Sequence, residues 1–401
     1  MNSINATIAA MAKAARQASQ AMTRVTSGQK NQALQAMADE IVRQADAVCA
    51  ENQRDVRAAR STGLAPALID RLTITDGTIA AMASGLREVA ELPDPVGSLG
   101  PSRVRPNGLE IARMRIALGV IGIIYESRPN VTVDAAGLCL KAGNAVILRG
   151  GSEAFHSNRA LAAVIGRALA DTGLPAAAVQ VVPVTDRAAV NALLEQEECI
   201  DLIIPRGGEE LIRFVVAHSR IPVLKHYKGV CHTFVDQSAD LDRAVAIIHN
   251  AKVQRPGTCN ALECLLVHQA VARKLLPKIA KKLGAAGVQF RCCKASLAIM
   301  GPLLGPKAVA ATKADWGCEF LSLTLAVKVV ADLDEALEHI AQHGSNHTEA
   351  ILTESHQNAM RFTREADASM VAVNASTRLN DGGELGLGAE VGISTTKLHA
   401  Y

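Results

Sequence analysis

The chain has 401 residues, of which 49% are hydrophobic and 20% charged, and its 42 basic and 39 acidic side chains leave a formal net charge of +3. This composition excludes an intrinsically disordered protein, and a chain of this length is expected to form two or more substructures. The charge is spread without a basic block and only 2% of the residues are aromatic, so nucleic acids are not expected partners.

Two local patterns open the chain. Across residues 3–92 apolar residues recur at spacings of three and four, as at Leu34 and Ala38, which predicts a helical lead-in. Prolines between residues 93 and 106 end this pattern. Across residues 108–118 apolar and charged residues roughly alternate, which predicts a projecting β-hairpin.

No segment predicts export, a membrane span or a metal site. Residues 1–20 are interrupted by charges and lack the apolar core of a signal peptide, and the longest apolar run, 116–125, is about half of what a membrane-spanning helix needs. The nine cysteines are too sparse for a disulfide scaffold, and they lack the repeated pairs of a structural zinc site. We therefore expect a cytoplasmic protein without a metal.

The rest of the chain alternates strand-like and helix-like segments. Almost wholly apolar runs, which suit parallel strands buried on both faces, lie at 146–148, 179–182 and 202–204, and a second series lies at 262–267, 326–330 and 370–373. After the run at 326–330, Asp332 and Glu335 resemble a capping box, and Gly344 is expected to end the helix. The pattern predicts an α/β fold with two α/β halves.

Cys259 is the strongest candidate for a reactive side chain. Pro256 and Gly257 favour a turn just before it, and the strand-like segment that begins at Ala261 would hold the thiol in place. A thiolate is a strong nucleophile, and backbone amides or the cation of Arg255 would lower the thiol pKa from about 8.5. The alternative is a packing residue, because cysteines outside disulfides are commonly buried.

Asn130 lies just beyond the apolar strand that ends at Tyr125. Ligand groups gather at the carboxyl ends of strands in open parallel sheets, and there the Asn130 amide could donate to an oxyanion. Asparagine also caps helices well, and this segment alone favours the cap.

Two glycine turns follow strands in the first half. In the stretch from Arg149 to Glu153, backbone amides at a helix start could meet a phosphate or ribose, and Arg149 could pair with the 2′-phosphate of NADP. Ser152 would serve equally well as a helix cap. Arg206, Gly207 and Gly208 repeat this arrangement and could cradle a pyrophosphate, although an ordinary solvated turn suits either stretch alone.

Taken together, these stretches resemble the aldehyde dehydrogenase superfamily, and within it the branch that reduces an acyl phosphate of glutamate. The resemblance covers nearly the whole chain in one order. Besides the Cys259 and Asn130 segments and the two glycine turns, it is carried by Asp94–Gly97, Arg105–Leu109, Leu138–Asn144, Asn374–Arg378 and Asn380–Ala400.

The resemblance implies a role for each candidate residue. Cys259 would be the nucleophile, and the Asn130 amide would stabilise the oxyanion. The implied cofactor-binding residues are Arg149, Ser152 and Glu153 at the adenosine ribose, Arg206, Gly207 and Gly208 at the pyrophosphate, and Glu319 at the nicotinamide ribose. The candidates for the amino-acid end of the substrate are Ser376, Thr377 and Arg378.

The implied activity is NADPH-dependent reduction of L-glutamyl 5-phosphate to L-glutamate 5-semialdehyde and phosphate through a cysteine thioester, in proline biosynthesis. Acid-forming relatives activate water with a glutamate in an E-L-G-G-K-like segment, but the corresponding stretch here, Leu224–Gly229, has no carboxylate. That difference favours phosphate or hydride over water as the partner of the thioester. The choice between NADP and NAD stays open.

The resemblance also implies two α/β domains with a projecting oligomerisation hairpin. Residues 1–96 and 119–232 would bind the cofactor, residues 233–380 would carry the catalytic cysteine, and residues 97–118 and 381–401 would form the hairpin and a C-terminal segment. Relatives extend beyond the motif at residues 398–400, whereas this chain stops at Tyr401. A homo-oligomer is therefore expected but in doubt, and whether a glutamate kinase hands over the small-molecule substrate is open.

Two other functions are compatible with the sequence. An acid-forming aldehyde dehydrogenase would oxidise the semialdehyde equally well without phosphate. A nucleotide-binding or interaction protein could use the same fold. Replacing Cys259 with alanine separates the last from a reductase, which would lose turnover and retain nucleotide binding.

Overall fold

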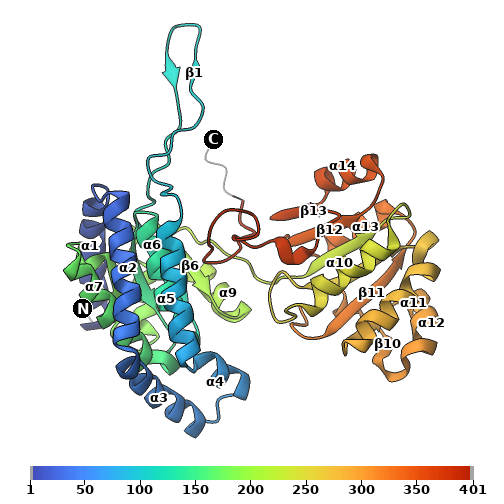
Figure 1. Ribbon diagram of the computed structural model, residues 1–401, viewed down its shortest axis with the longest axis horizontal. Coiled ribbons are helices and arrows are strands. Elements are labelled where there is room, and N and C mark those ends of the chain that lie inside the picture. The colour runs from blue at the N-terminus through green and yellow to red at the C-terminus, as the bar shows by residue number, and fades with distance from the viewer. Residues whose placement is uncertain (1–2, 398–401) are drawn as a thin grey trace. The chain divides into compact units, whose positions relative to one another are not determined.

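The computed structural model describes residues 3–397, and the chain divides between Leu224 and Lys225 into two compact units. The motif at residues 398–400 and Tyr401 lie outside the described residues. Each unit holds a parallel β-sheet with helices packed on it (Figure 1), so the predicted α/β fold is confirmed. The boundary that we expected from the sequence, between 232 and 233, lies inside the first strand of the second unit.

The first unit begins with the helical lead-in that the sequence predicts. Its helices are α1 (Ser3–Met22), α2 (Ser27–Arg43), α3 (Ala45–Ser61), α4 (Pro66–Leu72) and α5 (Asp76–Glu91). Thr26 starts α2 with a capping box that Gln29 completes, which satisfies two backbone N–H groups at the helix end. The apolar stripe that contains Leu34 and Ala38 is fully buried.

The sheet of the first unit is parallel and has the strand order β5-β4-β3-β6. Its elements in chain order are β3 (Val120–Tyr125), α6 (Asn130–Lys141), β4 (Ala145–Arg149), α7 (Phe155–Asp171), β5 (Val179–Val181), α8 (Ala188–Leu194), β6 (Leu202–Arg206) and α9 (Glu209–His218). The chain runs outward from β3 to β5 and then crosses to β6 on the other side of β3. The carboxyl ends of β3 and β6 therefore flank a topological switch point, where open sheets bind ligands.

The predicted hairpin is present between α5 and β3. Strands β1 (Arg103–Val104) and β2 (Glu110–Ile111) pair antiparallel, and the hairpin extends away from the first unit in Figure 1. Its apolar side chains face solvent: Val104 is 72% exposed and Ile116 is 77% exposed.

The sheet of the second unit has seven parallel strands in the order β10-β9-β11-β8-β7-β12-β13. Its elements are β7 (Cys231–Val235), α10 (Leu241–Val253), β8 (Leu262–His268), α11 (Gln269–Ala285), β9 (Gln289–Cys292), α12 (Lys294–Leu304), β10 (Ala308–Ala310), β11 (Thr324–Val330), α13 (Leu333–His343), β12 (Thr348–Leu352), α14 (His356–Glu365) and β13 (Met370–Val373). Strand β8 lies at the centre, and all seven of its residues are buried. Cys259 therefore precedes the central strand of the sheet, which is buried along its whole length.

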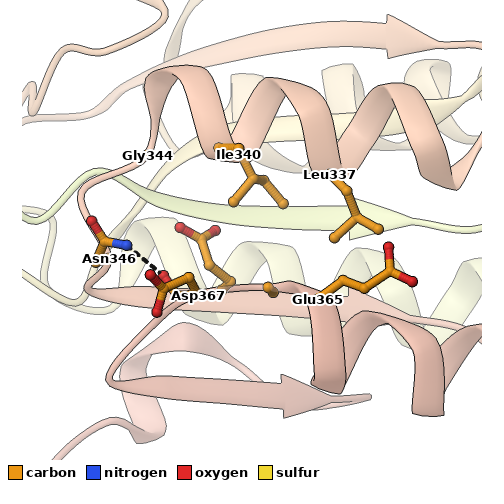
Figure 2. A pocket seen from close by; sticks show the side chains of 9 residues that line it. Leu337, Ile340, Gly344, Asn346, Glu365 and Asp367 are labelled. Carbon is orange, nitrogen blue, oxygen red and sulfur yellow. Dashed lines mark hydrogen bonds between the residues drawn. The ribbon is translucent and has the colours of Figure 1, made fainter. Parts of the chain in front are cut away.

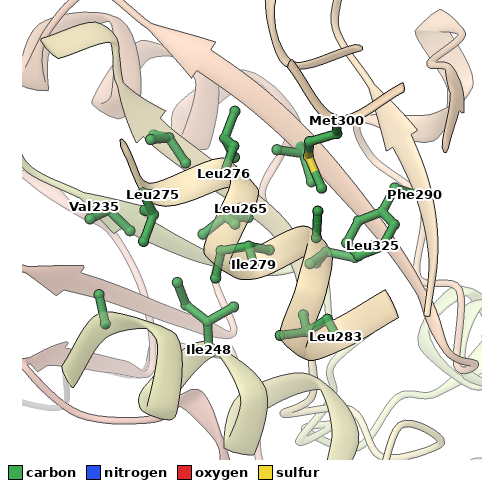
Figure 3. Close-up of a cluster of buried hydrophobic side chains, with 14 of the residues drawn as sticks. Val235, Ile248, Leu265, Leu275, Leu276, Ile279, Leu283, Phe290, Met300 and Leu325 are labelled. Carbon is green, nitrogen blue, oxygen red and sulfur yellow. The ribbon is translucent and has the colours of Figure 1, made fainter. Parts of the chain in front are cut away.

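Both faces of this sheet are covered, because successive β8 side chains point to opposite sides. Leu265 joins the core beneath α10, α11 and α12 (Figure 3), together with Ile279 and Phe290. Its neighbour Leu266 joins a second core beneath α13 and α14. Burial of each such side chain stabilises the fold by about 1.5–3 kcal/mol.

The helices that follow these strands begin with side-chain caps. Asp240, His268, Cys293, Asp332 and Ser355 accept from backbone N–H groups at the starts of α10, α11, α12, α13 and α14. The predicted capping box at α13 is only half correct: Asp332 accepts from the Glu335 N–H, but the Glu335 carboxylate accepts from the N–H of Ala331. Gly344 ends α13 as expected.

None of the helices in residues 3–397 has the length and apolar character needed to cross a membrane.

Candidate active site

Cys259 sits on a turn that leads directly into the central strand of the second unit. The Thr258 N–H donates to the Arg255 carbonyl at 3.3 Å, which closes the turn that Pro256 and Gly257 predict. Cys259 is partly exposed, whereas Cys264 inside β8 is buried. Cys259 is thus less buried than Cys231 and Cys264.

Two histidines lie beside Cys259. His226 is on the loop before β7, His347 directly precedes β12, and Cys259 stands before β8. No two of the three donor atoms, the thiol sulfur and one ring nitrogen from each histidine, are more than 4.8 Å apart. The loops that precede β7, β8, β11 and β12 are here called the amino rim. Three of these loops carry His226, Cys259 and His347.

Two residues near the start of β7, Gly229 and Cys231, contact the backbone of Cys259. The Cys231 thiol donates to the Cys259 carbonyl at 3.2 Å, and burial, with the Glu349 carboxylate nearby, raises the pKa of the Cys231 thiol, so that it keeps its proton. A Cβ atom on Gly229 would lie 2.8 Å from the Cys259 Cα, closer than real Cβ contacts allow. Only glycine lets these two segments approach so closely.

The predicted substrate-binding residues, Ser376, Thr377 and Arg378, lie beside the same loop. The Arg378 guanidinium donates to the side-chain oxygen of Asn260, and its Nε donates to Gln254 at 3.1 Å. The hydroxyl of Ser376 accepts from the Arg378 N–H, and Thr377 is fully buried.

Asn260 also anchors the returning chain. Its amide donates to the Asn380 carbonyl at 2.9 Å, and the Asn380 amide in turn donates to Thr348 at the start of β12 at 2.7 Å. Asn260, the residue after Cys259, thus fastens the segment at 376–380 to the amino rim.

Glu319 reaches the amino rim through the loop before β11. It lies close enough to Glu263 of β8 for its charge to raise the Glu263 pKa, and the Leu321 N–H next to it donates to Glu263 at 3.2 Å. Glu263 forms a fully buried ion pair with Lys252 at 2.6 Å. Burial raises the pKa of Glu263 to about 7 against the opposing charge of Lys252.

The other candidates lie in the first unit, at the carboxyl ends of β3, β4 and β6. Asn130 is the first residue of α6 and does not cap it: Pro129 holds the cap position, and the Asn130 amide donates to Asp134 at 3.0 Å. Burial raises the pKa of Asp134. The cap that the local sequence favours is therefore wrong.

Arg149, Ser152 and Glu153 follow β4. Arg149 donates to the Thr185 carbonyl at 3.0 Å, and its Nε is buried without a hydrogen-bond partner. Ser152 is exposed and caps no helix; Asp55 of α3 instead accepts from the first N–H groups of α7. Glu153 accepts from the backbone and hydroxyl of Ser127, at 2.6 and 2.7 Å.

Arg206, Gly207 and Gly208 form the turn between β6 and α9, across the switch point from β3. The Gly208 N–H donates to the carboxylate of Glu126 at 2.9 Å, and a Cβ atom on Gly207 would lie 2.7 Å from that carboxyl carbon. The Gly208 amide, at the start of α9, thus already donates to a negatively charged group. Together with the orphaned Arg149 Nε, the turn fits the phosphates of a dinucleotide.

Two other features of the second unit are not part of this site. A cavity of about 60 Å³ between α13 and α14 is lined by Leu337, Ile340 and Asn346, among others (Figure 2), and is far too small for a nucleotide. His232, Cys264 and His339 lie within 4.8 Å of one another. Contact with Glu349 raises the pKa of His232 to about 10 despite its burial, and an imidazolium does not bind metal ions.

Sequence reasoning missed several of these residues. The stretch Leu224–Gly229 was read for its missing carboxylate, although it contains His226 and Gly229, and His347 carried no pattern of its own. Glu126 lies between β3 and Asn130, but its contact with the turn after β6 was not predicted. The available signal was positional, since each residue flanks the end of an apolar strand.

Comparisons with known proteins identify the family of this chain. The profile of the aldehyde dehydrogenase family matches residues 2–314. The chain is similar to the gamma-glutamyl phosphate reductase of Desulfatibacillum aliphaticivorans, with 59% identity over 399 residues that cover 100% of this chain and 94% of that protein. It is 60% identical over 398 residues to the protein of the same name from Oleidesulfovibrio alaskensis, covering 99% and 94%. The crystal structure of gamma-glutamyl phosphate reductase from Thermotoga maritima superposes with a TM-score of 0.93 and 46% identity, covering 98% of this chain and 94% of that one.

Proposed function

Because this chain belongs to the aldehyde dehydrogenase family and, within it, to the gamma-glutamyl phosphate reductases, we propose that it reduces L-glutamyl 5-phosphate to L-glutamate 5-semialdehyde and phosphate in proline biosynthesis. The observation that carries this proposal is the position of Cys259, a partly exposed residue on a turn before the central strand of a seven-stranded sheet.

Cys259 is the proposed nucleophile. Its sulfur attacks the carbonyl carbon of the acyl phosphate, phosphate leaves, and a thioester remains on the protein. The turn closed by Arg255 and the tight contact with Gly229 hold the backbone of Cys259 in one place. Such preorganisation lowers the entropic cost of reaching the attack geometry.

NADPH is the proposed reductant, and bound NADPH supplies the hydride that converts the thioester to the aldehyde level. Arg206, Gly207 and Gly208 are the proposed holders of its phosphates, which would displace the Glu126 carboxylate from the Gly208 amide. We assign Arg149, Ser152 and Glu153 to the adenosine ribose and its 2′-phosphate, and Glu319 to the nicotinamide ribose.

Asn130 is the proposed oxyanion donor. Its amide bonds to Asp134 in this structure and would exchange that partner for the developing oxyanion. One such donor contributes about 3 kcal/mol to the transition state, so Asn130→Ala is expected to lower kcat by about 100-fold to 1,000-fold.

The substrate's amino-acid end is assigned to Ser376, Thr377 and Arg378, which the structure ties to the Cys259 loop through Asn260. The stretch from Lys225 to Gly229 lacks the carboxylate that activates water in acid-forming relatives, which favours phosphate or hydride over water as the partner of the thioester.

The setting of the enzyme is also proposed. A cytoplasmic location suits cysteines that are not in disulfides. The exposed apolar side chains of the hairpin at 97–118 support a homo-oligomer that buries them. A glutamate kinase is the proposed source of the substrate, because an acyl phosphate is labile in water.

The reverse reaction tests the proposal. Glutamate 5-semialdehyde should reduce NADP+ only when phosphate is present, and Cys259→Ala should abolish turnover while nucleotide binding persists. Cys49→Ala, which changes a half-buried cysteine in α3, is the matched control and should keep activity. NADP+ reduction of equal rate without phosphate would identify an acid-forming dehydrogenase instead.

A further inference from the structure

We propose that His226 is a catalytic residue that takes the proton from the Cys259 thiol as the thioester forms, and that His347 is a positioning residue for it. The inference deepens the proposed function and rests on Cys259 being the nucleophile.

The geometry places a base at the reacting sulfur. The Cys259 sulfur and one ring nitrogen from each histidine lie within 4.8 Å of one another, a gap that a small ring movement or one bridging water closes. Cys259 and His226 are both half-buried, so a substrate can approach them, while His347 is buried beneath them.

The environment keeps His347 neutral. Its ring packs edge-on against the His226 ring, with 5.5 Å between centroids, and its Nδ1 lies 2.8 Å from the Thr348 hydroxyl. Burial, with His226 as a second contribution, lowers the pKa of His347 to about 3. Because the His347 ring is neutral, it adds no positive charge that would make protonation of the neighbouring His226 ring less favourable.

His347 has one feature that its packing leaves unexplained. Its Nε2 is buried and has no hydrogen-bond partner within the described residues. An unpaired buried nitrogen destabilises the fold, which fits a group whose partner arrives during the reaction.

The loop that carries His226 is fixed on both sides. The Lys225 carbonyl accepts from the Thr395 N–H at 3.1 Å and the Ser394 hydroxyl at 3.0 Å, and the Val230 N–H donates to Ser345 at 2.9 Å. A base on an anchored loop keeps its orientation between turnovers.

The titratable groups that surround this pair come from every adjoining segment. The charged and titratable groups are Lys225, Tyr227 and Lys228 on the same loop, Cys231 on β7, Cys259 and Glu263 at β8, Cys318 before β11, and His347 and Glu349 at β12.

The proton balance of the step is complete. The S–H bond of Cys259 breaks and its proton moves to the His226 imidazole, while a bond forms between sulfur and the acyl carbon. The bond from that carbon to the phosphate oxygen breaks, and the imidazolium returns the proton to this oxygen. The products are a thioester, hydrogen phosphate and neutral His226.

The test measures Cys259 directly, because nine cysteines are present. The protein without ligands is treated with iodoacetamide between pH 5.5 and 9.5, and alkylation of the Cys259 peptide is followed by mass spectrometry. We expect an inflection below the value of about 8.5 for an ordinary thiol in the wild type, and a shift to about 8.5 or higher in His226→Gln. The phosphate-dependent kcat/KM should fall by about 100-fold or more.

Three further variants sharpen the outcome. His356→Gln, an exposed histidine at the start of α14, should match the wild type in both measurements. His226→Ala should recover activity with added imidazole, which also covers the case of a poorly folded His226→Gln. His347→Asn should shift the alkylation profile in the same direction as His226→Gln by a smaller amount.

An unchanged pH profile in His226→Gln, or alkylation slowed by one factor at every pH, would overturn the proposal, because a merely structural role predicts one of these. Failure of the proposed function would look different: the wild type would not reduce NADP+ with the semialdehyde, while the alkylation profile would still report on the histidine.

Discussion

Gly229 passes so close to Cys259 that a Cβ atom there would lie 2.8 Å from the Cys259 Cα. Gly229→Ala must therefore push the Cys259 loop away from β7, and a shift of about 1 Å in a catalytic residue, the role that we propose for Cys259, can cost 100-fold in rate. We expect kcat/KM for phosphate-dependent NADP+ reduction to fall by about that factor. Gly166→Ala, at a helical site with no atom within 4 Å of the added Cβ, should keep full activity.

Arg378, which we assign to the substrate's amino-acid end, is joined to the Cys259 loop through Asn260 and Gln254. Arg378→Ala removes two charge-assisted hydrogen bonds, each contributing about 1.5–3 kcal/mol, together with the proposed partner of the substrate carboxylate. We expect the KM for the semialdehyde to rise by about tenfold or more, measured by steady-state kinetics. Arg364→Ala, on the exposed side of α14, is the control, and an equal effect there would count against this role.

Glu126 occupies the amide of Gly208 that we assign to a cofactor phosphate. Glu126→Gln removes a negative charge from this turn, so the Kd for NADP+ measured by calorimetry should decrease by several-fold at low salt. The gain should shrink as ionic strength rises, because salt screens the repulsion. Weaker binding in this variant would place the phosphates elsewhere.

Lys252 and Glu263 form a fully buried ion pair beside β8. Lys252→Met leaves a buried carboxyl group without its cation, and we expect unfolding in urea to become easier by about 3–5 kcal/mol. Lys252→Met/Glu263→Gln removes both charges and keeps an acceptor for the Leu321 N–H, so most of the loss should be recovered. A double variant no more stable than the single one would contradict this account.

His339 makes the free energy of unfolding depend on pH in the acidic range. Burial lowers the pKa of His339 to about 3, so below about pH 6.5 the unfolded chain binds a proton that the folded chain refuses. Its contribution is complete above pH 6.5 and is lost as the pH falls, by about 1.4 kcal/mol per pH unit.

The measurement compares the free energy of unfolding of the wild type and His339→Gln at pH 6.5 and pH 5. The wild type should lose about 2 kcal/mol more than the variant over this interval. Glu263, with a raised pKa, has the opposite dependence, but it is present in both proteins and cancels. Parallel curves for the two proteins would disprove the assignment.

Much of the fold could be predicted because its strands are buried on both faces. Runs such as Leu202–Ile204 and Leu262–Val267 are apolar for that reason and lie in β6 and β8. The turn before Cys259 was also predictable, because Pro256 and Gly257 determine local geometry. The strand order of the seven-stranded sheet was not predictable, since it depends on which apolar faces meet across the chain.

The candidate site was predicted in part. Cys259 and Ser376–Arg378 do lie together, but the contacts that join them run through Asn260, whose role depends on residues over 100 positions away. The cap at Asn130 was wrong because Pro129 takes that position and Asp134 accepts the amide. His347 was not predicted, because the features that distinguish it, its burial and its neighbours, leave no local sequence pattern.

The carboxyl rim of the seven-stranded sheet contrasts with the amino rim, because its loops end in the helix caps Asp240, His268, Asp332 and Ser355. The proposed catalytic residues of this unit and most of its helix caps thus lie at opposite edges of one sheet. A fluorophore attached at Glu354, an exposed position on the carboxyl rim, would therefore report the folding of this unit while leaving turnover undisturbed.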